Sequence, residues 1–313
     1  MSISRRTFLG TTALGGATGE VPWAAGIDEN TGMPTRILGR TGARVSLLAY
    51  GCGASFREYG SFDEALATLT RALDLGISYI DTAVAYGDGQ SEKIVGALMT
   101  TRRKEVWLCT KIRPRGQDEI GRLFEESLTR LRTDQVDLLH IHDLQGYDDL
   151  AAIESPQGAL KAFYRIRDEK QARFIGITSH KDAAVLKTAL ERHDFDCVQM
   201  SLNPALRGTG GEHSFESLAL PVAVRKKMGV IAMKVLAQAR FKAPAAQLMH
   251  YALSLPVSCG AVGMPTQKVL EEDVRIAKAF RPLRASEMKK LAEDLSAAHK
   301  ASLERFFRYH VDA

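Results

Sequence analysis

Four ionisable side chains lie at spacings that could bring them together in one site. They are Asp81, Tyr86, Lys111 and His142; Lys111 follows Asp81 by 30 residues, and His142 follows Lys111 by 31. A phenol alone is a weak acid at neutral pH, because it titrates at about pH 10. A buried ammonium beside it would stabilise the phenolate, and a carboxylate would keep that ammonium charged. The set therefore predicts a general acid whose strength its neighbours adjust.

An imidazole beside these groups can orient a carbonyl oxygen or share the proton. A tuned acid aimed at a carbonyl suits hydride transfer from a nicotinamide. We therefore expect Tyr86 to move the proton, while Asp81 holds Lys111 in place and His142 faces the carbonyl.

The elements that must position these residues repeat in a fixed order. Apolar runs, typical of parallel strands covered on both faces, alternate with amphipathic helical patterns. Eight such repeats favour a closed (β/α)₈ TIM barrel over an open sheet. The predicted strands are Ser46–Gly51, Ser78–Asp81, Val106–Lys111, Val136–His142, Phe174–Ser179, Cys197–Leu202, Val230–Val235 and Ser258–Gly263. The predicted helices are Phe62–Leu75, Ser91–Thr100, Glu119–Arg132, Gln157–Glu169, Lys181–Arg192, Phe215–Met228, Pro244–Leu255 and Lys268–Ala279.

Barrels of this kind assemble their sites at the C-terminal ends of the strands. Asp81, Lys111 and His142 end the second, third and fourth predicted strands, so their spacing is one βα unit per step. We expect them to stand side by side at the rim, with Tyr86 in the loop just past Asp81. The pair Ser91-Glu92 is expected only to begin the following helix, with Ser91 as its cap.

Two further segments complete the predicted domain. A hairpin of Thr35–Leu38 and Arg44–Leu48 precedes the first barrel strand and should plug its N-terminal mouth. Ala285–His299 and Ala301–Arg308 read as a C-terminal helical tail. The run Gly51-Cys52-Gly53 has only the first half of a dinucleotide-binding glycine motif, which argues against a Rossmann domain.

The composition is that of an ordinary globular protein, with 45% hydrophobic and 25% charged residues. The net charge is +5, but the basic residues are scattered among acids, so we expect no nucleic-acid partner. No apolar run has the length of a membrane span, so stable membrane insertion is not expected. The cysteines follow no metal-binding spacing and are expected to be buried small hydrophobes: Cys52, Cys109, Cys197 and Cys259.

The first residues resemble a twin-arginine export signal. Arg5-Arg6 precedes Phe8 and a small, modestly apolar stretch from Thr11 to Gly19. A disordered basic tail is the alternative interpretation. We expect residues 1–26 to form the leader, 27–34 a linker and 35–313 the barrel. The expected location is the periplasm, reached through the twin-arginine machinery, or the cytoplasm if the leader does not function.

Other functions compete for the same residues. His140-x-His142 is a spacing that metal-dependent hydrolases on barrels use, and both side chains could face the barrel interior. The eighth predicted strand ends without the carboxylate such enzymes carry, so no metal is expected. A nicotinamide-binding sensor, or an isomerase that regenerates its nicotinamide in place, remains open.

The motifs resemble those of the aldo-keto reductases over nearly all of the chain after about Thr35. The likeness is carried by Asp81-Thr82-Ala83-x-x-Tyr86-Gly87, by Lys111 and by the run Val136–His142. It implies a catalytic tetrad of Asp81, Tyr86, Lys111 and His142. The leader, Met233-Lys234 and the run Tyr251–Pro256 are similar to an exported bacterial subgroup.

The resemblance also implies NADP(H) bound across the barrel mouth, with NAD(H) as an alternative, and a carbonyl or alcohol substrate of aldehyde, ketone or sugar type. The nicotinamide carboxamide would be held by Ser179 and Gln199, with His180 and Asn203 completing the pattern. Met233 stands where a stacking tyrosine is frequent, and Asp273 where an asparagine contacts adenine. The other residues implied to hold the cofactor are Lys234, Gly263, Thr266 and Lys268.

Overall fold

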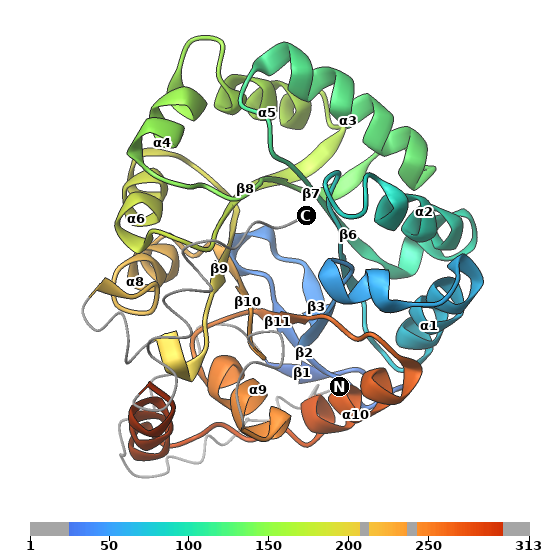
Figure 1. Ribbon diagram of the computed structural model, residues 1–313, viewed down its shortest axis with the longest axis vertical. Coiled ribbons are helices and arrows are strands. Elements are labelled where there is room, and N and C mark those ends of the chain that lie inside the picture. The colour runs from blue at the N-terminus through green and yellow to red at the C-terminus, as the bar shows by residue number, and fades with distance from the viewer. Residues whose placement is uncertain (1–24, 207–212, 237–242, 297–313) are drawn as a thin grey trace, which may run out of the picture.

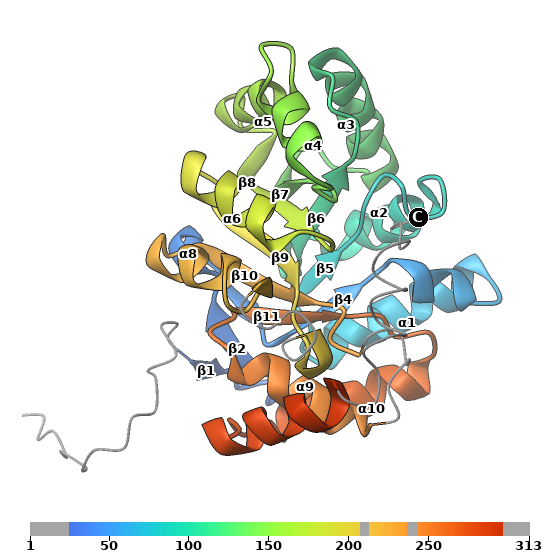
Figure 2. The same cartoon turned by 60° about the vertical axis from the view of Figure 1, so that its left-hand side comes forward.

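The computed structural model describes residues 25–206, 213–236 and 243–296, and these form a closed barrel of eight parallel strands. Neighbouring strands follow the chain order around the barrel, and the last strand pairs with the first. Figures 1 and 2 show the helices around the outside. The predicted (β/α)₈ fold is confirmed. The barrel strands are β4 (Leu48–Gly51), β5 (Tyr79–Asp81), β6 (Trp107–Ile112), β7 (Val136–Ile141), β8 (Ala172–Ser179), β9 (Cys197–Ser201), β10 (Gly229–Met233) and β11 (Cys259–Val262).

The helices form an outer layer because each turns its apolar stripe toward the strands. Local capping agrees with the sequence in α1, where the Ser61 hydroxyl accepts a hydrogen bond from the Glu64 N–H. The α-helices are α1 (Phe62–Asp74), α2 (Gln90–Arg102), α3 (Gln117–Leu131), α4 (Tyr147–Glu154), α5 (Ala159–Asp168), α6 (Ala183–Arg192), α8 (Ala219–Arg225), α9 (Ala245–Ser254) and α10 (Gln267–Lys278). Short 3₁₀ turns are η1 (Gly39–Thr41), η2 (Ala54–Glu58) and η3 (Arg103–Glu105).

The N-terminal hairpin closes the bottom of the barrel, as predicted. Strands β2 (Pro34–Ile37) and β3 (Arg44–Ser46) pair antiparallel, and Leu38 and Val45 pack into the cluster inside the barrel. The buried Arg36 donates to the carbonyls of Val257 and Leu253, which fastens the hairpin to the last βα unit. These contacts leave the opposite, C-terminal mouth as the open end.

The segment expected to be a linker is folded. Strand β1 (Gly26–Ile27) pairs with β2, and a turn closed by Asp28 connects them. The Thr31 N–H donates to the Asp28 carboxylate, so this stretch extends the hairpin into a three-stranded sheet. A local side-chain hydrogen bond at Asp28 is the signal that the sequence offered.

Two helix predictions need correction. Between β7 and the predicted helix Gln157–Glu169, where no helix was predicted, the structure has α4 with Leu150 and Ile153 buried; its eight residues are too few for a clear helical period. The helix expected over Phe215–Met228 is reduced to α8, because Ser214 forms a turn with Ser217 before it. At the C-terminus, residues 285–296 are helical, whereas the expected helix Ala301–Arg308 lies outside the described residues.

Within the described ranges, no helix is both long and apolar enough to cross a membrane.

Candidate functional site

The four predicted residues meet at the C-terminal mouth of the barrel. Asp81 ends β5, Lys111 lies near the end of β6, and His142 follows β7 directly. The Lys111 Nζ atom donates to Asp81 Oδ2 at 2.9 Å and to Tyr86 OH at 3.2 Å. The His142 ring stands edge-on to the Tyr86 ring, with centroids 5.7 Å apart. The one-unit spacing read from the sequence therefore produces a contiguous cluster.

The centre of this cluster is a buried ion pair. Asp81 is 3% exposed and Lys111 1% exposed. Burial opposes the charge on Lys111, but the Asp81 carboxylate and the Tyr86 hydroxyl outweigh it and raise the pKa of the lysine above its ordinary value. The Thr82 carbonyl accepts a further hydrogen bond from the ammonium at 2.9 Å. A charged Lys111 is thus held against the Tyr86 hydroxyl.

Gln199 joins the cluster in a way that the sequence did not show. Its Nε2 donates to Asp81 Oδ2 at 3.1 Å, so Asp81 accepts from Lys111 and Gln199 through one oxygen. Gln199 Oε1 is buried without a partner among the residues the structure describes. Such an acceptor suits an amide N–H₂ donor, and a nicotinamide carboxamide carries one.

The other residues expected near the nicotinamide lie around Gln199. Ser179 ends β8, and its hydroxyl donates to the Leu144 carbonyl at 2.9 Å. His180 Nδ1 lies 3.4 Å from the Ser201 hydroxyl. The Asn203 side chain donates to the Lys234 carbonyl at 3.1 Å and also accepts from a backbone N–H.

Lys234 and its neighbour Met233 end the seventh barrel strand. Met233 is the last residue of β10 and is buried. Lys234 has a left-handed backbone with φ of 54°, a conformation uncommon for a residue with a side chain. The hydrogen bond from Asn203 holds this turn in place, so the backbone direction of Lys234 is set by β9 as well as by β10.

The segment after β11 carries the remaining predicted cofactor residues. Gly263 and Lys268 are exposed, and Thr266 caps α10 by accepting from the Val269 N–H. Asp273 is buried, and Oδ2 has no partner in the described part of the chain. Burial raises the pKa of its carboxyl to about 7, and Glu272 adds to the rise. Near neutral pH this carboxyl can therefore donate as well as accept a hydrogen bond.

Ser91 and Glu92 lie in the first turn of the helix that they were expected to begin, but the prediction that Ser91 caps this helix is wrong. Helix α2 begins after Gly89 with no side-chain cap, and the Ser91 hydroxyl instead donates to the Cys52 carbonyl at 2.9 Å. The same hydroxyl lies 2.7 Å from Thr82 Oγ1. The Ser91 N–H donates to the Tyr86 carbonyl. Ser91 therefore ties the Tyr86 loop to β4 and β5.

Glu92 connects the start of α2 to β6 and α3. Its fully buried carboxylate accepts from Thr110 Oγ1 at 2.6 Å and from Arg130 Nε at 2.7 Å, and it also contacts the Ser127 hydroxyl. Thr110 precedes Lys111 in β6, so one carboxylate connects the start of α2 with the strand that carries the lysine. Helix capping statistics cannot reveal this role, because the partners lie far away in sequence.

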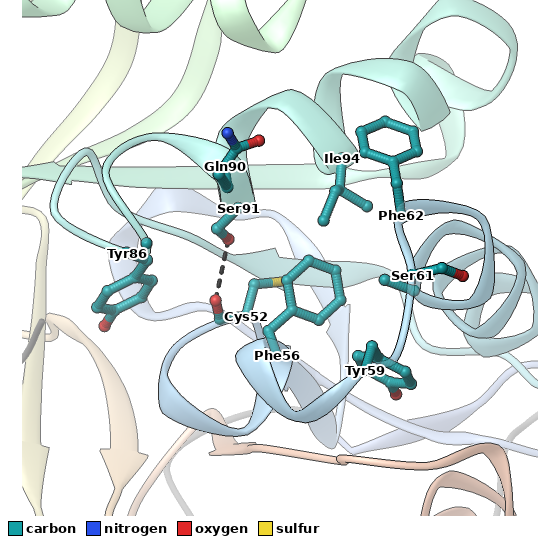
Figure 3. A pocket seen from close by; sticks show the side chains of 11 residues that line it. Cys52, Phe56, Tyr59, Ser61, Phe62, Tyr86, Gln90, Ser91 and Ile94 are labelled. Atoms are coloured by element: carbon teal, nitrogen blue, oxygen red, sulfur yellow. Dashed lines mark hydrogen bonds between the residues drawn. The ribbon is translucent and has the colours of Figure 1, made fainter.

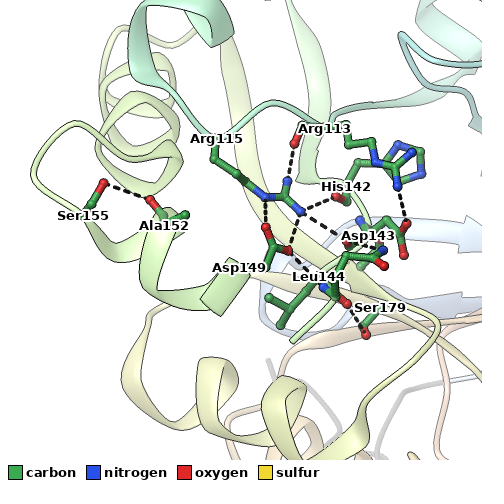
Figure 4. Close-up of polar contacts among 11 residues, drawn as sticks. Arg113, Arg115, His142, Asp143, Leu144, Asp149, Ala152, Ser155 and Ser179 are labelled. Atoms are coloured by element: carbon green, nitrogen blue, oxygen red, sulfur yellow. Dashed lines mark hydrogen bonds and ion pairs between the residues drawn. The ribbon is translucent and has the colours of Figure 1, made fainter. Parts of the chain in front are cut away.

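Arg115 is a second residue that the sequence analysis missed. Its guanidinium pairs with both oxygens of Asp149, at 2.7 and 2.8 Å. Nη2 also donates to the carbonyls of His142 and Asp143, at 3.0 and 3.1 Å (Figure 4). Arg115 thus fixes the backbone that carries His142. The only sequence signal was the alternation Lys111-x-Arg113-x-Arg115 beyond the third strand.

His140 lies deeper in the barrel and is fully buried. Burial lowers the pKa of its imidazole well below the ordinary value, and the charges of Lys111 and His142 lower it further. A Cβ atom at Gly176 would lie 2.5 Å from His140 Nδ1, so that glycine makes room for the ring. Within the described ranges, no three His, Cys, Asp or Glu side chains are placed to share a metal ion. The cysteines are buried and free, as expected: Cys52, Cys109, Cys197 and Cys259.

A cavity of about 360 Å³ lies beside Tyr86, between η2 and the first turns of α1 and α2 (Figure 3). Phe56, Phe62 and Ile94 give it a mainly apolar wall. The Tyr86 ring forms one edge, and Figure 3 shows its hydroxyl directed away from the cavity. The cavity therefore lies on the side of the Tyr86 ring away from its hydroxyl.

Residues 47–249 match the model of the aldo/keto reductase family. The chain is 33% identical over 159 residues to an L-galactose dehydrogenase of Arabidopsis thaliana. The aligned region covers 47% of this chain and 49% of that protein. It is 32% identical over 228 residues to a D-threo-aldose 1-dehydrogenase of a Pseudomonas species, covering 62% and 67%. The match to the plant enzyme thus spans about half of that relative's length.

Solved structures show the same fold. The holo form of an aldo-keto reductase from Bacillus halodurans superposes with a TM-score of 0.71 at 23% identity, covering 84% of this chain and 96% of that one. An aldo-keto reductase from Klebsiella pneumoniae in complex with NADPH gives 0.68 at 22% identity, covering 83% and 94%.

Proposed function

Because the chain belongs to the aldo/keto reductase family, we propose that it interconverts a carbonyl group and an alcohol with NADP(H) as the hydride carrier. Tyr86 is the general acid in the direction of reduction. One observation carries this assignment: the Tyr86 hydroxyl lies 3.2 Å from a buried ammonium that Asp81 holds at 2.9 Å.

The chemistry follows from these contacts. NADP(H), when bound, would supply the hydride for the carbonyl carbon, and the negative charge would then develop on the carbonyl oxygen. Tyr86 gives its proton to that oxygen, and the phenolate left behind is stabilised by Lys111. His142, edge-on to the Tyr86 ring, faces the same oxygen. A solvent proton then restores Tyr86, and alcohol oxidation reverses every step.

The cofactor assignment rests on the mouth of the barrel. Gln199 Oε1, which has no hydrogen-bond partner among the described residues, fits the carboxamide of a nicotinamide, and Ser179 lies at the adjacent strand end. Lys234 and Lys268 offer charge to the phosphates, and Met233 offers a thioether to pack on the ring. A fold relative was solved with NADPH bound. NADP(H) is therefore the proposed cofactor, with NAD(H) as the alternative.

The proposed substrate is a small carbonyl or hydroxyl compound of sugar or aldehyde type. Two relatives carry names that describe oxidation of sugars, L-galactose and D-threo-aldoses. The family assignment argues against a metal-dependent hydrolase. Within the described ranges, His140 also lacks the neighbouring side chains that a metal ion needs as ligands. The isomerase and sensor alternatives would use the same nicotinamide site as the proposed oxidoreductase, but neither would consume NADPH in net turnover.

The proposal is tested with the purified full chain, NADPH and a series of aldehydes. We expect a saturable change in fluorescence when NADPH is added to the protein. When an aldehyde follows, the nicotinamide absorbance should fall, with one alcohol formed per NADPH consumed. Binding of NADPH with no net oxidation by any aldehyde, ketone or aldose would instead favour the sensor or the isomerase. Failure to bind either NADPH or NADH would contradict the whole assignment.

We further propose that residues 1–26 direct export through the twin-arginine machinery; these residues lie outside the described ranges, except for the last two. The supporting observation is Arg5-Arg6 ahead of Phe8 and a small apolar stretch. Replacing Arg5 and Arg6 by lysine should retain the protein in the cytoplasm, because this pathway reads the arginine pair rather than its charge. Cell fractionation with an immunoblot measures the outcome. A doubly substituted protein that still reaches the periplasm would refute this route.

A further inference from the structure

We propose that Arg113 and Asp143 form a subsite that reads a hydroxyl group next to the reacting carbonyl, and that the substrates are neutral hydroxylated carbonyl compounds. This inference rests on the proposed carbonyl–alcohol chemistry. It goes beyond that chemistry by naming the residues that determine substrate specificity and the charge of the preferred substrate.

Both residues stand next to the tetrad. Arg113 lies two positions beyond Lys111, in the segment that follows β6, and Asp143 follows His142 directly. Arg113 Nη2 lies 3.3 Å from Asp143 Oδ2 (Figure 4). The Ser179 hydroxyl, expected beside the nicotinamide, donates to the carbonyl of Leu144, the next residue along. Asp143 therefore lies between His142 and the strand end predicted to hold the nicotinamide.

The backbone at Asp143 is held in an uncommon conformation. Its φ is 60°, in the left-handed region that a residue with a side chain rarely occupies. Thr178 maintains it: the Asp143 N–H donates to the Thr178 hydroxyl at 2.8 Å, and the Leu144 N–H donates to the Thr178 carbonyl. Backbone strain that neighbours enforce is frequently found at functional sites. Here it fixes the direction of a carboxylate.

Only one oxygen of the Asp143 carboxylate has a hydrogen-bond partner among the described residues. Asp143 is 1% exposed, and Oδ1 has no hydrogen-bond partner among the described residues. Leaving a buried charged acceptor unpaired is costly, so an orphan of this kind calls for a ligand or a function. A hydroxyl donor would satisfy it.

Arg113 and Arg115 differ in how many hydrogen bonds their guanidinium groups form within the protein. Arg115 is bound by both oxygens of Asp149 and by three backbone carbonyls. Among the described residues, the Arg113 guanidinium forms its one hydrogen bond with Asp143, at the long distance of 3.3 Å, although its charge also acts on Asp149; 37% of its side chain is exposed. Arg113 is therefore the side from which a ligand reaches the pair, and its remaining N–H groups can donate to that ligand.

The charge balance selects the class of ligand. Arg113 and Arg115 are matched by Asp143 and Asp149, so the cluster carries no net charge. An anionic carboxylate has no hydrogen to donate, so it cannot satisfy Asp143 Oδ1 and would place a like charge beside that oxygen. A neutral hydroxyl can donate to Asp143 Oδ1 and accept from Arg113 at the same time, which leaves neither group unpaired. A simple unsubstituted aldehyde has no hydroxyl to donate to Asp143, and its one oxygen is the reacting carbonyl.

The test compares three aldehydes of similar size with the full-length protein: glyceraldehyde, which has a hydroxyl beside the carbonyl, propanal, which has none, and glyoxylate, which is anionic. Wild-type kcat/KM should be highest for glyceraldehyde. In Asp143→Asn, which tolerates the left-handed backbone, and in Arg113→Gln, the ratio of kcat/KM for glyceraldehyde over propanal should fall at least about tenfold. Because the ratio is compared between variants, hydration of the aldehydes cancels.

Asp148→Asn, on the exposed surface of α4, is the matched control and should keep the wild-type ratio. A purely structural role for Asp143 and Arg113 would slow both aldehydes equally, so an unchanged ratio in both variants refutes the subsite while the proposed function stands. Preference of the wild type for glyoxylate refutes the neutral class. Wild-type protein that binds NADPH yet reduces none of the three, and no ketone or aldose either, refutes the proposed function itself, and the subsite with it.

Discussion

Replacing Tyr86 by phenylalanine should slow hydride transfer to an aldehyde by about 10²- to 10⁴-fold, the usual contribution of a positioned general acid. The substitution removes the hydroxyl that lies 3.2 Å from Lys111 Nζ and keeps the ring that packs against His142. Single-turnover stopped-flow measurement of NADPH oxidation isolates the chemical step. Titration with NADPH should remain near the wild-type value, because the residues proposed to hold the nicotinamide are untouched.

Tyr164→Phe is the matched control, since Tyr164 lies on the outer helix α5, remote from the tetrad. It should turn over like the wild type. Wild-type single-turnover rates in Tyr86→Phe would show that another group supplies the proton, and the assignment of the general acid would then fall.

Replacing Lys111 by methionine should damage both activity and stability. The phenolate loses its cationic neighbour, and the Asp81 carboxylate is left buried with Gln199 as its other side-chain donor. Breaking a buried ion pair by removing one partner costs about 3–5 kcal/mol. Urea unfolding measures this loss, and steady-state kinetics should show a fall in kcat of at least about 10²-fold.

A second variant separates the two effects. Combining Lys111→Met with Asp81→Asn removes the uncompensated charge, so part of the lost unfolding free energy should return while kcat stays low. Recovery of activity in the double variant would contradict the role given to the ammonium. Equal stability of Lys111→Met and the wild type would contradict the buried pair itself.

The pair also gives a signed expectation for pH. Lys111 has a pKa raised above its unfolded value, so its contribution to stability is complete below the ordinary pKa of lysine and is lost only as pH rises through the folded pKa. Between neutral pH and the ordinary lysine pKa, the pair therefore contributes a constant term to the unfolding free energy.

Several features of this protein were determined by local sequence alone. The alternation of apolar runs and amphipathic helices predicted the barrel, because each strand must be covered by the helix that follows it. The spacing of Asp81, Lys111 and His142 predicted their meeting, because one βα unit advances the chain by one strand around a closed sheet. These periodic patterns can be recognised in the sequence because each depends on residues within about one βα unit.

Only the tertiary structure decided what the polar residues around the tetrad do. Ser91 looked like a helix cap, yet its hydroxyl bonds the Cys52 carbonyl from β4. Glu92 looked like a first-turn acid, yet its partners come from β6 and α3. These bonds join residues 18 to 39 positions apart, at distances that no local propensity encodes.

The same reason applies to the groups proposed to contact the substrate. Nothing local distinguishes Arg115, which is fully engaged by Asp149, from Arg113, which is not. Whether a charged side chain is spent on the fold or left for a ligand depends on which partners the closed barrel brings within hydrogen-bond range. The sequence by itself brought Tyr86 together with Asp81, Lys111 and His142, and the packing of neighbouring strand ends decided that Asp143 keeps one oxygen without a partner in the described structure.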